Sequence, residues 1–145
     1  MNASPARSLL ALYLLLAGLS GCPRRSAIWI VGQEAPGRPV FGVGNTVRGD
    51  STWLGLLIVG WCDNWDGTAR NAVWFLSQDN GPVVSLSRVV YGRVPRGYFY
   101  MSHDSSRTTV SPPLGPGCYI ASISGTGRVR FQISADGSVL ELGDQ

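Results

Sequence analysis

The segment at positions 61–67, with the sequence WCDNWDG, carries the densest set of chemically useful side chains in the chain. Indole rings stack on the apolar face of a sugar ring, and carboxylates accept hydrogen bonds from its hydroxyl groups. These side chains form a candidate ligand-binding set for a carbohydrate: Trp61, Asp63, Trp65 and Asp66. The alternative is a connection between strands, in which Trp61 is buried beside a disulfide and the polar residues make turn contacts.

The same segment does not follow the spacing of a known metal loop. An EF-hand places oxygen ligands at loop positions 1, 3 and 5 and a glutamate at position 12. Counted from Asp63, position 3 is Trp65 and position 12 is Trp74. Zinc also lacks ligands, because the sequence has 1 His and its spare cysteines are expected to pair. We predict no metal and no cofactor, with an irregular calcium site as the alternative.

The polar loop that begins His103-Asp104-Ser105-Ser106 suggests a hydrolase at first sight. A triad needs a base within hydrogen-bond reach of the nucleophile and a third group that orients the base. Neighbours in one loop rarely meet this geometry, and the chain has no Gly-x-Ser-x-Gly motif. Four acids are available for a glycosidase pair, but no spacing selects two of them: Glu34, Asp50, Asp63 and Asp66. We therefore predict a protein that is not an enzyme, with an envelope hydrolase using His103 as the less favoured alternative.

Arginines and aromatic residues are interleaved between positions 88 and 107. On adjacent strands they would form a basic, aromatic face suited to an anionic envelope polymer or a partner protein. The simpler arrangement points the aromatic rings inward and leaves the arginines in solvent. The residues of this candidate basic-aromatic face are Arg88, Tyr91, Arg93, Arg96, Tyr98 and Tyr100.

The N-terminus carries an export pattern. Arg7 precedes an apolar run at positions 9–19, which is too short to cross about 30 Å of hydrocarbon comfortably. The run closes on Leu19-Ser20-Gly21-Cys22, a tetrad that resembles the lipobox of bacterial lipoproteins. The resemblance implies that residues 1–21 are a signal peptide and that Cys22 carries a diacylglyceryl thioether and, as often in this family, an N-acyl chain such as palmitate. An ordinary secretory peptide with a chance cysteine is the alternative.

The lipoprotein resemblance also implies a place in the cell. Two or more acyl chains hold a protein stably at a membrane, so the domain would lie at the outer face of the cytoplasmic membrane or on the outer membrane. Residues 22–27 would then be a lipidated tether, and residues 28–145 a single domain. The expected partners are the membrane itself and an envelope protein or polysaccharide.

Removing Cys22 from the count leaves two cysteines, Cys62 and Cys118. An exported compartment permits disulfides, and only one intramolecular pair can form. Closing a loop of about 55 residues would constrain the unfolded chain by roughly 4 kcal/mol. We predict a disulfide between Cys62 and Cys118, with two separate buried thiols as the alternative.

The composition is that of a folded domain with few charges. Hydrophobic residues make up 44% of the chain and charged residues 14%, against about 25% in a typical domain. All 12 basic residues are arginine, and the formal net charge is +3. This weakly basic balance does not support nucleic-acid binding.

Beyond the signal segment the chain has the pattern of short strands separated by turn residues. The apolar run at 53–61 is typical of a central strand covered on both faces. In the stretch 128–134, Val129, Phe131 and Ile133 share one face, and polar residues share the other. We expect eight or nine strands among the segments 28–31, 39–43, 46–48, 53–61, 71–77, 83–91, 97–102, 118–124, 128–134 and 138–142.

This strand pattern predicts an all-β fold, an antiparallel β-sandwich of Ig-like or jelly-roll type preceded by a signal-peptide helix. Leu114, Pro116, Gly117 and Tyr119 resemble the Leu-x-Pro-Gly-x-Tyr segment that leads into a late strand of many extracellular sandwiches. The resemblance implies a Pro-Gly corner with the tyrosine packed across it. Taken together, the sequence favours a membrane-anchored binding or assembly module, with a carbohydrate- or peptidoglycan-binding module as the alternative.

Overall fold

The computed structural model describes residues 27–44, 52–79, 85–100, 111–123 and 127–143. Several sequence predictions lie outside these ranges: the signal peptide, Cys22, most of the tether, the strand at 46–48, Asp50 and the loop that begins at His103. Within the described ranges the chain forms strands and one short 3-10 helix, η1 (Ala69–Asn71).

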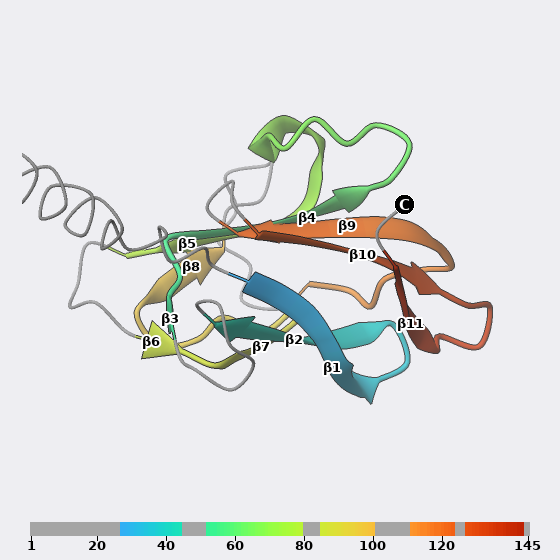
Figure 1. The fold of residues 1–145 in the computed structure, drawn as a ribbon, viewed down its shortest axis with the longest axis horizontal. Coiled ribbons are helices and arrows are strands. Elements are labelled where there is room, and N and C mark those ends of the chain that lie inside the picture. Colours follow the sequence, from blue (N-terminus) through green and yellow to red (C-terminus); the bar gives the residue numbers. More distant parts are fainter. Residues whose placement is uncertain (1–26, 45–51, 80–84, 101–110, 124–126, 144–145) are drawn as a thin grey trace, which may run out of the picture.

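Two antiparallel sheets pack face to face, which confirms the predicted β-sandwich (Figure 1). The three-stranded sheet has the order β1 (Ala27–Ala35), β2 (Arg38–Gly44) and β7 (Arg88–Val90). The six-stranded sheet has the order β11 (Val139–Leu142), β10 (Gly127–Ile133), β9 (Gly117–Ile123), β4 (Leu56–Trp61), β5 (Ala72–Gln78) and β8 (Tyr98–Tyr100).

Two of the predicted long strands are divided where the chain passes between the sheets. The run 53–61 gives β3 (Thr52–Trp53) and β4, and the run 83–91 gives β6 (Ser85–Leu86) and β7. The strands β3 and β6 pair with each other in a separate ribbon. Leu54, at the first break, is fully buried, and the Gly55 carbonyl accepts a hydrogen bond from the Gln78 amide at 3.2 Å. The run from 53 to 61 stays apolar across the break because Leu54, between β3 and β4, is buried as well as residues 57–60 of the central strand β4.

The core lies between the two sheets and follows the alternation of the strands. On β10, Val129, Phe131 and Ile133 are buried while Arg128 and Arg130 are exposed, as the period of two predicts. The large side chains that are almost completely buried come from both sheets: Phe41, Leu57, Val59, Trp74, Leu76, Val89, Tyr119, Ile123, Phe131 and Ile133.

One side of the sandwich is joined by side chains instead of a strand ladder. A shift in the β1–β2 register falls between Ile30 and Gly32. The Ile30 amide donates to the Glu141 carboxylate, and the Val139 amide donates to the Gln33 side chain, each at 2.8 Å. We call this contact between β1 and β11 the seam. It satisfies backbone donors that edge strands otherwise expose.

The strand order gives the sandwich two opposite ends. The distal end holds the β1–β2 turn, the β10–β11 turn, the end of β4 and the start of β9 (right side of Figure 1). Gly37 joins these parts, because its amide donates to the Gly137 carbonyl and its carbonyl accepts from the Leu114 amide. The opposite, N-terminal end holds the start of β1 at Ala27 and the end of β9 at Ile123.

The corner before β9 has the contact that the Leu-x-Pro-Gly-x-Tyr resemblance implies. The Tyr119 hydroxyl donates to the Gly115 carbonyl at 2.9 Å, and Leu114 is buried in the core. The tyrosine thus closes the corner of the chain and also forms part of the core, where its ring stacks on Phe131 at 5.6 Å.

Candidate functional site

The disulfide between Cys62 and Cys118 is present, with its Cα atoms 5.4 Å apart, which confirms the predicted pair. It links neighbouring strands of one sheet, because Trp61 pairs with Tyr119 and the Cys62 amide donates to the Cys118 carbonyl at 3.0 Å. In immunoglobulin domains the disulfide instead joins the two sheets through the core.

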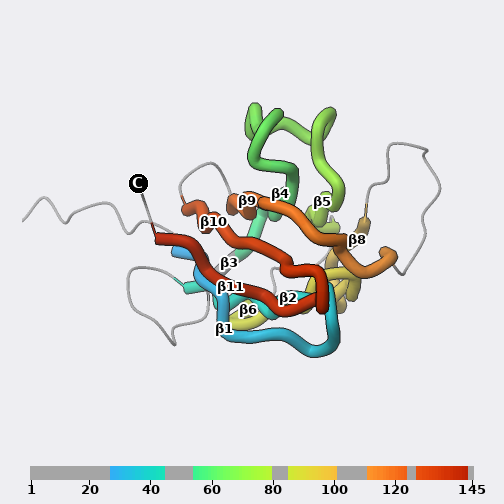
Figure 2. Tube along the Cα trace, turned by 90° about the vertical axis from the view of Figure 1, so that its right-hand side faces the viewer, coloured from blue at the N-terminus to red at the C-terminus, as the bar shows by residue number. Residues whose placement is uncertain are grey.

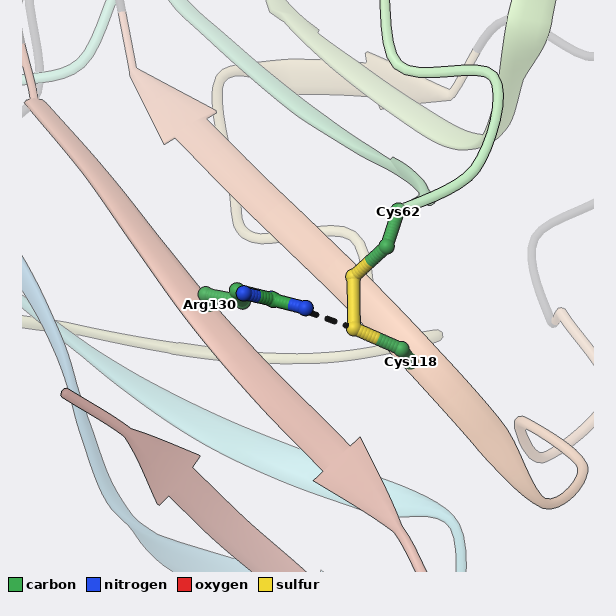
Figure 3. The surroundings of a disulfide bond; sticks show 3 residues. All are labelled: Cys62, Cys118 and Arg130. Carbon is green, nitrogen blue, oxygen red and sulfur yellow. Dashed lines mark hydrogen bonds between the residues drawn. A yellow bond between two sulfur atoms is a disulfide. The ribbon is translucent and has the colours of Figure 1, made fainter. Parts of the chain in front are cut away.

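The disulfide lies on the outer face of the six-stranded sheet, meaning the face turned away from β1, β2 and β7. Cys118 precedes Tyr119, which points into the core, so the cysteine side chain points outward. Both cysteines are partly exposed. The Arg130 Nε donates to Cys118 Sγ at 3.4 Å from the neighbouring strand β10 (Figure 3).

Trp61 ends β4 at the distal end and is 40% exposed. Its ring stacks on Tyr119, with the ring centroids 4.4 Å apart and the planes tilted by 31°. The same ring covers Gly117, where an added Cβ would overlap it. Trp61 is therefore not buried beside the disulfide. It is a supported aromatic ring with much of its surface open to solvent.

Trp65 packs on the opposite side of the same sheet. A Cβ built at Gly60 would lie 3.0 Å from Trp65 Cε3, so the Trp65 ring covers this glycine. Gly60 and Trp61 are consecutive in β4 and point to opposite faces. Figures 1 and 2 both show residues 62–71 rising from the outer side of the six-stranded sheet. The two indole rings consequently do not form one binding platform.

Asp66 organises the loop between β4 and β5. Its Oδ1 atom accepts from the Thr68 amide and hydroxyl, and its Oδ2 atom accepts from the Asn71 amide group, each at 2.8 Å. The hydrogen bonds from Thr68 lower the pKa of the Asp66 carboxyl below its ordinary 3.8. Asp63 is exposed at the start of the loop. Of the four candidate residues, Asp66 is thus already engaged in loop contacts.

The six residues of the candidate basic-aromatic face do not gather on one surface. Tyr91 and Tyr98 are 2% and 7% exposed, and burial raises the pKa of both phenols. Arg88 is exposed on β7 of the three-stranded sheet, whereas Tyr98 and the partly buried Tyr100 belong to β8 of the other sheet.

The remaining arginines of this set lie in solvent. Arg93 pairs with Glu34 of β1, at 2.8 Å, and Arg96 is exposed. The rings of Tyr91 and Tyr98 therefore point into the core, whereas these arginines point into solvent. The surface around the arginines contains neither of the two rings.

Sequence reasoning did not single out Arg130 or Arg38. Arg130 reaches Cys118 because β10 pairs with β9 in a register that places Gln132 opposite Cys118. The register between two strands is set by their facing residues, and the sequence of β9 and β10 taken strand by strand does not specify it. Arg38 donates to the carbonyl oxygens of Ser111 and Tyr91, at 3.0 and 3.4 Å, and holds two loops together.

Among the described residues, no three side chains of His, Cys, Asp or Glu are grouped as a metal ion would need. The described part of the chain also contains no helix with the length and hydropathy to cross a membrane.

Comparison with known proteins gives no relative from which a role could be taken: no family model, no curated protein and no solved structure matches this chain.

Proposed function

We propose that the protein is a lipid-anchored binding or assembly module of the cell envelope and has no catalytic activity of its own. The lipobox-like tetrad Leu19-Ser20-Gly21-Cys22 supports an anchor at Cys22. The tether of residues 22–27 extends over about 20 Å at most, at 3.3–3.6 Å per residue. A domain on so short a tether stays close to the lipid surface.

The opposition between the two ends of the sandwich is the observation that carries this proposal. β1 begins at Ala27, at the N-terminal end, whereas Trp61 and the loop 62–71 lie at the distal end. An anchor at Cys22 would therefore turn the N-terminal end to the membrane and present the distal loops to the envelope space. Loops on a rigid β-scaffold are common binding sites.

The anchor is tested by metabolic labelling of the full-length chain with a palmitate analogue, followed by membrane fractionation. We expect the native chain to be labelled and to sediment with membranes. The Cys22→Ser variant should be unlabelled and released from them, and Ser20→Ala, which keeps a small residue in the tetrad, should behave as the native chain. A native chain that takes up no label would refute the anchor.

We propose carbohydrate binding as the second candidate, with an envelope polysaccharide or peptidoglycan as ligand. The 40% exposure of Trp61, on a ring supported by Tyr119, is the observation that favours it. Flat aromatic rings with one free face are suited to the apolar face of a sugar. Asp63 is exposed two residues away and supplies a carboxylate.

Intrinsic fluorescence of the full-length protein in detergent, titrated with peptidoglycan fragments and envelope polysaccharides, tests this candidate. Trp61→Ala should abolish a saturable change while the circular dichroism of the fold is kept. Trp65→Ala is the matched control, because its ring lies on the opposite face over Gly60. An identical response in the native chain and in Trp61→Ala would exclude Trp61 as the binding residue.

A further inference from the structure

The disulfide between Cys62 and Cys118 lies at the partly exposed surface of the six-stranded sheet. It lies on the outer face, both cysteines are partly exposed, and neither belongs to the buried core. The strands that it joins are already held by the β4–β9 ladder from Leu57 to Trp61 and by the hydrogen bond between Cys62 and Cys118. Breaking the S–S bond therefore leaves the pairing of the two strands in place.

The surroundings of the two sulfur atoms are unequal. Arg130 Nε donates to Cys118 Sγ at 3.4 Å, and Figure 3 shows the guanidinium directed at this sulfur from β10. No carboxylate among the described residues forms an ion pair with Arg130 within 4.0 Å. Cys62 stands at the start of the loop 62–71, on the other side of the bond.

A guanidinium stabilises a thiolate much more than it stabilises a neutral disulfide sulfur, because the thiolate carries a full negative charge. A neighbouring arginine therefore lowers the pKa of a cysteine thiol. In thiol–disulfide exchange the sulfur with the lower thiol pKa is the better leaving group. Arg130 thus favours Cys118 as the sulfur that leaves and Cys62 as the sulfur that is attacked.

We propose that Cys62, Cys118 and Arg130 form a thiol–disulfide exchange site whose co-reactant is a thiol, either a small molecule or a reduced protein cysteine. The thiolate attacks Cys62 Sγ, a mixed disulfide forms there, and the bond to Cys118 breaks. Cys118 leaves as a thiolate that accepts a hydrogen bond from Arg130. A second thiolate then attacks the co-reactant's sulfur in the mixed disulfide, which reduces Cys62 and oxidises the two co-reactant thiols to a disulfide.

The position of attack is tested with the full-length chain carrying Cys22→Ser. Of the 3 cysteines in the native sequence, this variant keeps Cys62 and Cys118. The protein is treated with limiting reduced glutathione, quenched with an alkylating reagent and mapped by peptide mass spectrometry. We expect glutathione on Cys62 and the alkyl group on Cys118. Glutathione found mainly on Cys118, or no reaction, would overturn the proposal. The Cys22→Ser background has no anchor, so this result is independent of the proposed lipidation.

The role of Arg130 is tested with Arg130→Gln and with Arg128→Gln as matched control. Arg128 is exposed on the same strand and face, two residues away, and its replacement changes the net charge equally. At a pH above the thiol pKa, each unit by which Arg130 lowers that pKa makes the reduced form about tenfold more favourable, so the glutathione redox buffers are set above the ordinary thiol value of about 8.5. We expect Arg130→Gln to shift this equilibrium toward the disulfide and to slow reduction several-fold, and Arg128→Gln to leave both within twofold.

Equal shifts in the two variants would mean that Arg130 acts only through net charge, and would overturn its assignment. Near-UV circular dichroism during reduction completes the test. A spectrum that keeps its native features shows exchange in the folded chain, whereas loss of the spectrum at the rate of reduction would show that exchange requires unfolding and would refute a built site.

Discussion

The indole ring of Trp61 lies over Gly117, its diagonal neighbour across the β4–β9 ladder, so closely that a Cβ at position 117 would overlap the ring. This contact fixes the orientation of the most exposed tryptophan ring described at the distal end. Glycine at 117 is therefore required by the ring above it as well as by the corner that leads into β9.

Gly117→Ala should displace the Trp61 ring and destabilise the domain by about 1–3 kcal/mol, the usual cost of overpacking. Urea unfolding followed by tryptophan fluorescence measures both effects, and the native-state emission should shift to longer wavelength. Gly115→Ala is the control, since a Cβ there meets no atom within 4 Å. Equal stability of the two variants would contradict the contact.

Tyr119→Phe should remove the hydrogen bond to the Gly115 carbonyl and keep the stacking on Trp61 and Phe131. A loss of about 0.5–1.5 kcal/mol is expected for one such bond. Chemical unfolding with an unchanged denaturant slope would assign the loss to the folded state. A variant as stable as the native chain would show that the corner is held by packing alone.

Glu141→Ala should open the seam locally, because it removes the acceptor of the Ile30 amide. We expect faster hydrogen exchange at the Ile30 amide, while amides within the β9–β10 ladder keep their protection. Glu34→Ala is the control on β1, since Glu34 pairs with Arg93 instead of with β11. An unchanged exchange rate at Ile30 in Glu141→Ala would contradict the seam.

Alkaline pH should unfold the domain through its buried tyrosines. Burial raises the pKa of Tyr91, Tyr98 and Tyr119 above the ordinary 10.0, so the folded chain keeps protons that the unfolded chain releases. Stability is therefore fully present below pH 10 and is lost as pH rises above that value. Urea midpoints across this range, with phenolate absorbance as the second signal, measure the loss.

Tyr91→Phe should reduce this alkaline loss, since Tyr91 is almost completely buried and cannot ionise in the folded state without unfavourable desolvation. Phenols that ionise near their ordinary pKa while the fold persists would show that these side chains reach solvent more readily than their burial indicates.

Local patterns in the sequence predicted those parts of the fold that depend on local rules. The alternation of Val129, Phe131 and Ile133 predicted the buried face of β10, and the cysteine count predicted the disulfide. The turn between β10 and β11 also follows a local rule, because an Asp-Gly pair favours a tight turn. Gly137 has a positive φ of 82° there, and the Asp136 side chain accepts a hydrogen bond from the Ser138 amide.

Features that depend on how distant segments meet could not be predicted in this way. The break at Leu54 arises because the chain passes from the β3–β6 ribbon into the six-stranded sheet, and an apolar run looks the same on both sides of that break. Trp61 and Trp65 fall on opposite faces because the loop folds back over Gly60. The contact between Arg130 and Cys118 follows from the β9–β10 register. A register shift of one residue would turn one of the two side chains to the other face of the sheet and abolish the contact.

The opposed ends of the sandwich have a mechanical consequence. A load between an anchor that precedes Ala27 and a ligand held near Trp61 would run along the strands, because these points lie at opposite ends. Hydrogen bonds in antiparallel ladders are perpendicular to the strands, so such a load shears many of them together instead of breaking them in turn. β1 would take such a pull first, and the hydrogen bonds of Ile30 and Gln33 to β11 would share it with the β1–β2 ladder. The force needed to unfold the domain would then depend on the seam far more strongly than the free energy of unfolding does.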